Sequence, residues 1–265
     1  MEIFQVDAFT ANLFKGNPAA VMVVENWLDG GLMQHIAMEN NLSETAFVRK
    51  RDDESGWDIR WFTPTHEVSF CGHATLASAH ILHTEYQVPM PLTFFGQVGE
   101  LVVSLEKDDP KSPSYQLNFP VVPFEEIEAL PDAIGPSFSA TPRAIFKSYE
   151  NYFVELADEA AVRGFAPDLA ALAQLGTTGV VITAQGDEFD FVSRYFVPGA
   201  GIDEDPVTGS IHTSLVPYWA EKLGKSDFQA HQASERGGNL TCRLNGDRVQ
   251  IVGSATTYLR GNLCL

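Results

Sequence analysis

Reactive side chains gather in the segment EVSFCGHATLASAH, residues 67–80, where Cys71, Gly72 and His73 stand side by side. They lie where an apolar strand pattern gives way to a helical pattern of small residues. Three chemistries could use such an arrangement: a thiol nucleophile, a metal site, or backbone N–H groups that hold an anion at a helix N-terminus.

A second segment of this kind is GIDEDPVTGSIHTSLVPYW, residues 201–219. Here a helix is expected to start at Gly209, with Thr208 as its N-cap, and Asp205 precedes Ser210 by five residues. The unpaired N–H groups of such a helix start can bind a carboxylate. The alternative is a structural role, in which Asp205 stabilises a turn and Ser210 hydrogen-bonds to free backbone groups at the helix terminus.

Glu44 and His73 are the candidate proton-transfer groups. In NLSETAFV, the period of two places Glu44 on one face with Leu42, Ala46 and Val48. An acid there either points outwards at the strand end or, inside a closed pocket, becomes a general base. His73 is either a hydrogen-bonded structural group or the proton partner of Glu44.

No metal-binding motif is present among the cysteines and histidines. Cys71, Cys242 and Cys264 have no CxxC spacing, which predicts neither a zinc knuckle nor a disulfide framework and suits a reducing compartment. The histidines other than His73 form no HExxH pattern; they are His35, His66, His80, His83, His212 and His231. We therefore expect an activity without metal.

Composition excludes several classes of partner. The 265 residues carry 17 basic and 35 acidic side chains, a formal charge of −18 that repels nucleic acids and anionic membranes. The N-terminal stretch has no basic region, and no apolar run reaches the roughly 18 residues of a membrane span. A cytoplasmic protein without a nucleic-acid or membrane partner is expected.

The elements that position these residues form a repeated pattern. Strands are predicted at residues 1–9, 16–24, 41–50 and 56–64, and helices at 32–40 and from Gly72 onward. The segments DIRWFTP and DFVSRYFVP both end in Arg-aromatic-Phe-x-Pro, and each precedes a glycine-containing loop and a helix. This favours duplication of one unit.

The proline-containing stretch KDDPKSPSYQLNFPVVPFEE is the expected hinge, which predicts an N-terminal domain at residues 1–118 and a C-terminal domain at 119–265. The C-terminal strand could return to the first domain. The helix that starts at Gly72 is apolar on nearly every side, so it should lie inside its domain.

The order of DAFTANLFKGNPAAVMV, NLSETAFV, RWFTPTHEVSFCGHATLASAHIL and DEDPVTGSIHTSLVPYW resembles the phenazine-biosynthesis PhzF-like family across nearly the whole chain. The resemblance implies an α+β fold of two similar diaminopimelate epimerase-like domains. Each would be a barrel-like mixed sheet around a central helix, with the active site in a cleft between the domains. It also implies a homodimer.

The activity implied by this resemblance is an isomerase that needs no metal or cofactor and shifts a proton next to a carboxylate. The family pattern assigns the acid/base role to Glu44 and further catalytic roles to His73, Asp205 and Ser210. Backbone donors at Gly72, Gly209 and Ser210, together with the Asn17 side chain, would bind the carboxylate and stabilise enolate-like charge.

Cys71 leaves a second mechanism open. Cofactor-independent racemases place two thiols on opposite sides of the substrate, and the first lies in a Cys-Gly motif like this one. The second half has Thr208 and no cysteine in the corresponding loop. Two alternatives to the Glu44 isomerase remain: a racemase or epimerase that uses the single thiol of Cys71, and a ligand-binding protein without turnover.

Overall fold

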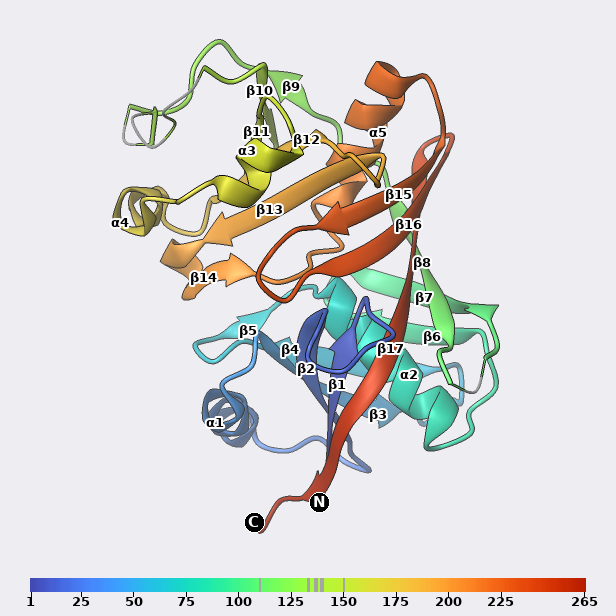
Figure 1. Cartoon of the computed structure of the whole chain (residues 1–265). Coiled ribbons are helices and arrows are strands. Elements are labelled where there is room, and N and C mark those ends of the chain that lie inside the picture. Colours follow the sequence, from blue (N-terminus) through green and yellow to red (C-terminus); the bar gives the residue numbers. More distant parts are fainter. Residues whose placement is uncertain (110, 133, 136–137, 139–140, 150) are drawn as a thin grey trace. The chain divides into compact units, whose positions relative to one another are not determined.

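The computed structural model describes residues 1–265 apart from 110, 133, 136–137, 139–140 and 150 (Figure 1). The chain divides into two compact units, the first formed by Met1–Asn118 with Ile251–Leu265 and the second by Phe119–Gln250. The long strand β17, Arg248–Asn262, carries the chain back into the first unit, where it pairs antiparallel with β1.

The first unit combines a mixed sheet with two helices. Its elements are β1 Glu2–Ala8, β2 Asn17–Val23, α1 Gly30–Asn40, β3 Glu44–Lys50, β4 Trp57–Phe62, β5 Glu67–Val68, α2 Gly72–Thr84, β6 Leu92–Gly96, β7 Gly99–Lys107 and β8 Ser114–Pro120, whose last residues enter the second unit.

The second unit likewise combines the strands of a mixed sheet with helices. Its elements are β9 Glu125–Glu126, β10 Ala144–Ser148, β11 Asn151–Glu155, α3 Glu159–Gly164, α4 Leu169–Leu172, η2 Ala173–Leu175, β12 Gly179–Gln185, β13 Phe191–Val197, η3 Pro198–Ala200, β14 Ile202–Asp205, α5 His212–Leu223, β15 Asp227–Gln232 and β16 Gly238–Asn245. Within the described part of the chain, no helix is long and apolar enough to cross a membrane.

Strand pairing follows one order in both units. In the first, β1–β2 is antiparallel, β2–β3 parallel, β3–β4 antiparallel and β4–β6 parallel. In the second, β10–β11 is antiparallel, β11–β12 parallel, β12–β13 antiparallel and β13–β15 parallel. The α+β class and the two similar epimerase-like halves expected from the sequence are therefore present.

The repeated arginine of the sequence motif has the same partners in each unit. Arg60 donates two hydrogen bonds to Glu67 at 2.7 and 2.6 Å, and its guanidinium lies over the Phe62 ring at 5.2 Å. Arg194 donates two hydrogen bonds to Glu204 at 2.8 and 2.9 Å, and its guanidinium lies over the Phe196 ring at 4.9 Å. Each pair joins the motif strand to the short strand that follows, which explains why arginine and phenylalanine recur together.

Helix α2 is the central element of the first unit. It contacts β1, β2 and β3, and every residue from Gly72 to Leu82 is buried. Small side chains let the strands approach the helix on several sides, which explains the apolar pattern over nearly its whole circumference. The predicted start at Gly72 is confirmed.

Helix α5 differs from expectation at its first turn. It begins at His212, three residues later than predicted, and Thr208 is not its N-cap. The His212 N–H donates to the Gly209 carbonyl at 3.1 Å and the Thr213 N–H to the Ser210 carbonyl at 3.1 Å. These i to i+3 bonds close Gly209–Ile211 into a tight turn before the regular helix.

Strand β3 is buried on both faces, since Thr45 and Phe47 are as inaccessible as Ala46 and Val48. Ala46, Phe47 and Val48 all have exposures of 0%. The strand contacts α1 as well as α2, and Phe47 packs in the apolar cluster that includes Met33 of α1. A strand covered on both sides is apolar on both sides.

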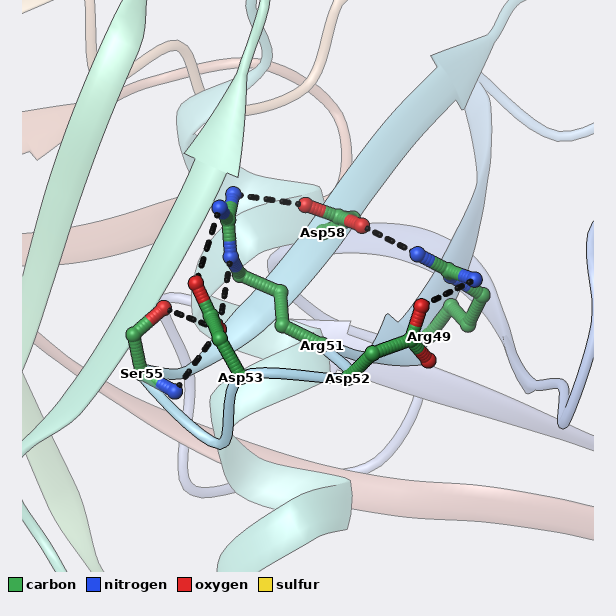
Figure 2. A network of polar contacts seen from close by, with 6 residues as sticks. All are labelled: Arg49, Arg51, Asp52, Asp53, Ser55 and Asp58. Atoms are coloured by element: carbon green, nitrogen blue, oxygen red, sulfur yellow. Dashed lines mark hydrogen bonds and ion pairs between the residues drawn. The ribbon is translucent and has the colours of Figure 1, made fainter.

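The β3–β4 hairpin ends in a network of charged side chains (Figure 2). Asp58 accepts hydrogen bonds from Arg49 at 3.0 Å and from Arg51 at 3.1 Å. Asp53 closes the turn through the Ser55 hydroxyl at 2.6 Å, and the hydrogen bonds from Ser55 and Arg51 hold its pKa well below the usual value. Such exposed pairs fix the shape of the turn and add little stability.

Candidate active site

The first unit brings three chain segments to one edge of its sheet. Strands β2 and β3 are parallel, with Ala19 opposite Glu44, so their N-terminal ends meet at the same edge. Asn17 begins β2 and Glu44 begins β3. Helix α2 packs on both strands and contributes Cys71 and His73 from its first turn. Predicted site residues that lie far apart in the sequence are thus neighbours.

The imidazole of His73 is the centre of this cluster. Its Nε2 lies 3.1 Å from Glu44 Oε2, a distance typical of an ion pair, although the two groups are not aligned as a hydrogen bond. Its Nδ1 lies 3.2 Å from Asn17 Nδ2 and 3.4 Å from Cys71 Sγ. Asn17 is fully buried beside the imidazole, so this contact helps to orient the His73 ring.

Burial and charge determine the protonation of the cluster. Burial, helped by the Glu44 charge, raises the pKa of the Cys71 thiol to about 11. Burial alone lowers the pKa of His73, but the neighbouring Cys71 and Glu44 outweigh it and hold that pKa well above the usual value. The contact of 3.1 Å between His73 Nε2 and Glu44 Oε2 is thus one of the causes that keep a proton on His73.

The second unit contains Asp205 in a hydrogen-bonded loop. Asp205 ends β14 and is buried, and its carboxylate accepts a short hydrogen bond from the Thr208 hydroxyl. Ser210 lies exposed in the turn that precedes α5. The structure therefore brings Asp205, Gly209 and Ser210 into one loop within this unit.

Gln232 holds that loop and was not predicted from the sequence. Its fully buried amide accepts from the Thr208 N–H at 2.8 Å and donates to the Asp205 carbonyl at 2.8 Å and the Thr208 hydroxyl at 3.2 Å. It ends strand β15, some way beyond the motif, in a segment DFQAHQ that carries no catalytic pattern. Only the parallel pairing of β15 with β13 places it there.

His212 and the other histidines have structural surroundings. Buried His212 donates from Nδ1 to the Thr208 carbonyl at 2.8 Å, and burial lowers its pKa to about 4. His80 and His83 lie against the Tyr115 hydroxyl at 3.2 and 3.1 Å. Within the described residues, the only group of three side chains spaced as metal ligands is Glu44, Cys71 and His73.

The family model of phenazine biosynthesis-like proteins matches residues 6–261. The chain belongs to this family. An uncharacterized isomerase of Pseudomonas aeruginosa is 47% identical over 266 residues, which cover 100% of this chain and 99% of the relative. These relationships place the chain among isomerases.

Solved structures support the same assignment. A PhzF-family protein of Enterococcus faecalis superposes with a TM-score of 0.90 at 43% identity and covers 100% of this chain and 99% of its own. A hydroxyproline epimerase from Agrobacterium vitis gives a TM-score of 0.67 at 11% identity, over 98% and 91% of the two chains. The second likeness shows that this phenazine biosynthesis-like protein has an epimerase fold.

Proposed function

We propose that this phenazine biosynthesis-like protein is a cofactor-independent isomerase that moves a proton next to the carboxylate of a small metabolite. Glu44 acts as the acid/base group and His73 as its proton partner. The contact of 3.1 Å between Glu44 Oε2 and His73 Nε2, at the first turn of a buried helix, carries this proposal. A carboxylate and an imidazole in contact can exchange a proton and so present either a base or an acid.

The surroundings supply stabilisation for negative charge. Removing a proton next to a carboxylate builds enolate-like charge on its oxygens, and preorganised N–H donors lower that barrier. The first turn of α2 has N–H groups without partners inside the helix, and Cys71 supplies no side-chain cap for them. We propose that donors at Gly72, Gly209 and Ser210 bind the substrate carboxylate and that Asp205 takes part in the reaction.

Among the described side chains in contact with His73, Glu44 is the one carboxylate, which suits a double-bond shift. An epimerisation would require a second acid, a role that Asp205 would then have to take. A single carboxylate can remove a proton from one carbon and return it to another on the same face of the substrate. Inversion of a centre needs a second acid on the opposite face. The remaining ionisable neighbour of His73, Cys71, has a pKa of about 11 and is a weak acid at neutral pH.

The one-thiol mechanism keeps one supporting observation. Cys71 Sγ lies 3.4 Å from His73 Nδ1, a Cys–His contact of the kind that can activate a thiol. Burial opposes it by favouring the neutral thiol. The third alternative is ligand binding without turnover. It predicts that a carboxylate ligand stabilises the protein, is not converted into a product and does not exchange its own hydrogens with solvent.

The test is incubation of the protein with small carboxylic acids, saturated and unsaturated, in deuterated water. Products are scored by mass gain and by NMR, which detects an isomer even when the proton returns internally. We expect a new isomer with incomplete deuterium incorporation, abolished by Glu44→Gln and unaffected by Glu39→Gln, an exposed glutamate of α1. A full equivalent of deuterium at an inverted centre would indicate a two-base epimerase instead.

A cytoplasmic location and a homodimeric state belong to the same proposal. All three cysteines, Cys71, Cys242 and Cys264, are free thiols, which suits a reducing compartment. Light scattering during size-exclusion chromatography measures the subunit number directly. A mass of about 58 kDa, twice the 29.1 kDa of one chain, is the expected result.

A further inference from the structure

The donor atoms of Glu44, Cys71 and His73 are spaced as metal ligands. One oxygen, the sulfur and one ring nitrogen all lie within 4.8 Å of one another. Cys71 Sγ is 4.0 Å from His73 Nε2, and that nitrogen is 3.1 Å from Glu44 Oε2. Zinc bonds of about 2.0–2.3 Å place the donors of a tetrahedral site about 3.3–3.6 Å apart. The two separations that involve His73 therefore need shifts of about half an ångström, and the Glu44 carboxylate and the Cys71 sulfur, which lie within 4.8 Å of each other, need to approach by up to about 1.3 Å.

We propose that Glu44, Cys71 and His73 form an inhibitory zinc site. The thiolate sulfur and the imidazole nitrogen select zinc over magnesium or calcium, which prefer oxygen ligands. As zinc binds, two protons leave to solvent: the Cys71 thiol proton, so that the bound sulfur is a thiolate, and the proton on His73 Nε2, so that this nitrogen has a free lone pair for the metal. A water molecule would take the fourth coordination position of the zinc.

Asn17 provides the outer contact that such a site needs. With zinc on Nε2, the Nδ1 of His73 carries the hydrogen and requires an acceptor. The Asn17 amide already lies 3.2 Å from Nδ1, and a half-turn of the amide presents its oxygen in place of its nitrogen. The buried surroundings of Asn17 thus orient the imidazole in either state.

Inhibition, unlike binding, rests on the proposed function. Zinc would occupy the carboxylate oxygen of Glu44 and the Nε2 of His73, the two atoms assigned to proton transfer. The metal and the proton therefore compete for the same lone pairs. Zinc should act as a reversible inhibitor, and a chelator should preserve activity or restore it.

The binding experiment uses tag-free full-length protein and a chromogenic zinc indicator as competitor. We expect one zinc per chain and, with Co²⁺ as probe, a thiolate-to-metal charge-transfer band. Cys71→Ala and Cys71→Ser should each weaken binding at least about 100-fold, since even loss of an outer contact costs 10–100-fold. Cys242→Ala, at a buried thiol, and Cys264→Ala, at an exposed one, are the matched controls.

Two outcomes overturn the zinc site. One is binding that Cys264→Ala removes and Cys71→Ala leaves intact, and the other is no stoichiometric binding by protein whose circular dichroism shows it folded. In the activity arm, zinc should inhibit wild type and lose its effect on Cys71→Ala. Zinc binding through Cys71 without any isomerase activity would refute the proposed function alone. Activity lost to a chelator and restored by zinc would overturn the inhibitory role.

Discussion

The two units place a side-chain hydrogen bond at corresponding points of their helix starts, although α2 begins directly at Gly72 and α5 begins only after the tight turn at Gly209–Ile211. The Thr75 hydroxyl donates to the Cys71 carbonyl at 2.6 Å, and His212 Nδ1 donates to the Thr208 carbonyl at 2.8 Å, four residues back in each case. Cys71-Gly72-His73 therefore corresponds to Thr208-Gly209-Ser210. The place of the thiol in the first unit is taken by a hydroxyl in the second.

The difference shows how a duplicated scaffold separates chemistry. In the first unit, the helix start carries a buried His73 in contact with a carboxylate, and the strands on which α2 packs supply Glu44 and Asn17. In the second, the corresponding loop carries Asp205 and Thr208, held by the neutral amide of Gln232. An imidazole and a carboxylate lie in contact in the first unit, whereas the loop of the second carries Asp205 in hydrogen bonds with Thr208 and Gln232.

Removal of the first unit's base should have the largest effect. Glu44→Gln keeps the size and polarity of the side chain but removes the proton acceptor, so turnover should fall by about two orders of magnitude or more. Steady-state kinetics on the substrate found in the deuterium screen measures this loss, with Glu39→Gln as the control. A rate within about threefold of wild type would remove Glu44 from the mechanism.

Changes in the second unit's loop should affect ligand binding more than folding. A bound carboxylate raises the melting temperature by mass action. Ser210→Ala and Asp205→Asn should reduce that rise, while the melting temperature without ligand changes by less than about 2 °C, since Ser210 is exposed and Asn keeps an oxygen for Thr208. Differential scanning fluorimetry measures both quantities.

The matched control for that loop is Thr241→Ala, on strand β16 away from residues 205–210. It should leave the ligand-induced rise unchanged. An undiminished rise in both loop variants would show that Asp205 and Ser210 do not serve the ligand.

The sequence predicted the scaffold better than the contacts. Repeated motifs around Arg60 and Arg194 indicated duplication, because each arginine binds a glutamate on the next strand. The helix at Gly72 was predicted because burial on nearly all sides leaves a continuous apolar pattern. The alternation that groups Glu44 with Ala46 and Val48 did not indicate that the other face of strand β3 is buried as well, because a strand covered on both sides has apolar residues on both.

Contacts between distant segments had no sequence signal. The approach of Asn17 to His73 depends on which strand ends meet at one sheet edge. Gln232 reaches its loop only through the parallel pairing of two strands. The tight turn before α5 depends on i to i+3 bonds that Gly209–Ile211 adopt locally, which residue types alone do not distinguish from a regular first turn.

The equivalence of Thr75 and His212 can be tested through pH. His212 has its pKa lowered to about 4 by burial, against about 6.5 in the unfolded chain, so the unfolded state binds the proton first as pH falls. Stability should then decrease from pH 6.5 towards pH 4, by about 1.4 kcal/mol per pH unit for each such histidine. Burial also lowers the pKa of His80 in α2 to about 4, so this histidine adds a second, similar loss of stability over the same pH range.

His212→Thr copies the first unit's residue and should keep the hydrogen bond to the Thr208 carbonyl. Urea titrations at pH 6.5, 5.5 and 4.5 give the free energy of unfolding. In this variant it should fall less steeply with decreasing pH, and the slope should be smaller by the contribution of one histidine, about 1.4 kcal/mol per pH unit. The contribution of His80 to the pH dependence of stability should remain, and wild type serves as the reference at each pH. An unchanged slope would show that His212 accepts a proton in the folded state as readily as in the unfolded chain.

The smallest effect is expected at the thiol that distinguishes the two helix starts. The corresponding loop of the second unit has Thr208 and no cysteine, and burial raises the pKa of Cys71 to about 11, so this thiol is a poor acid and a poor base at neutral pH. Cys71→Ala should retain most activity and lose about 1 kcal/mol of stability through packing. Cys242→Ala, at a thiol with 0% exposure, calibrates the packing loss. If Cys71→Ala unfolds like Cys242→Ala yet loses nearly all turnover, the thiol itself reacts, and the one-thiol racemase replaces the Glu44 isomerase.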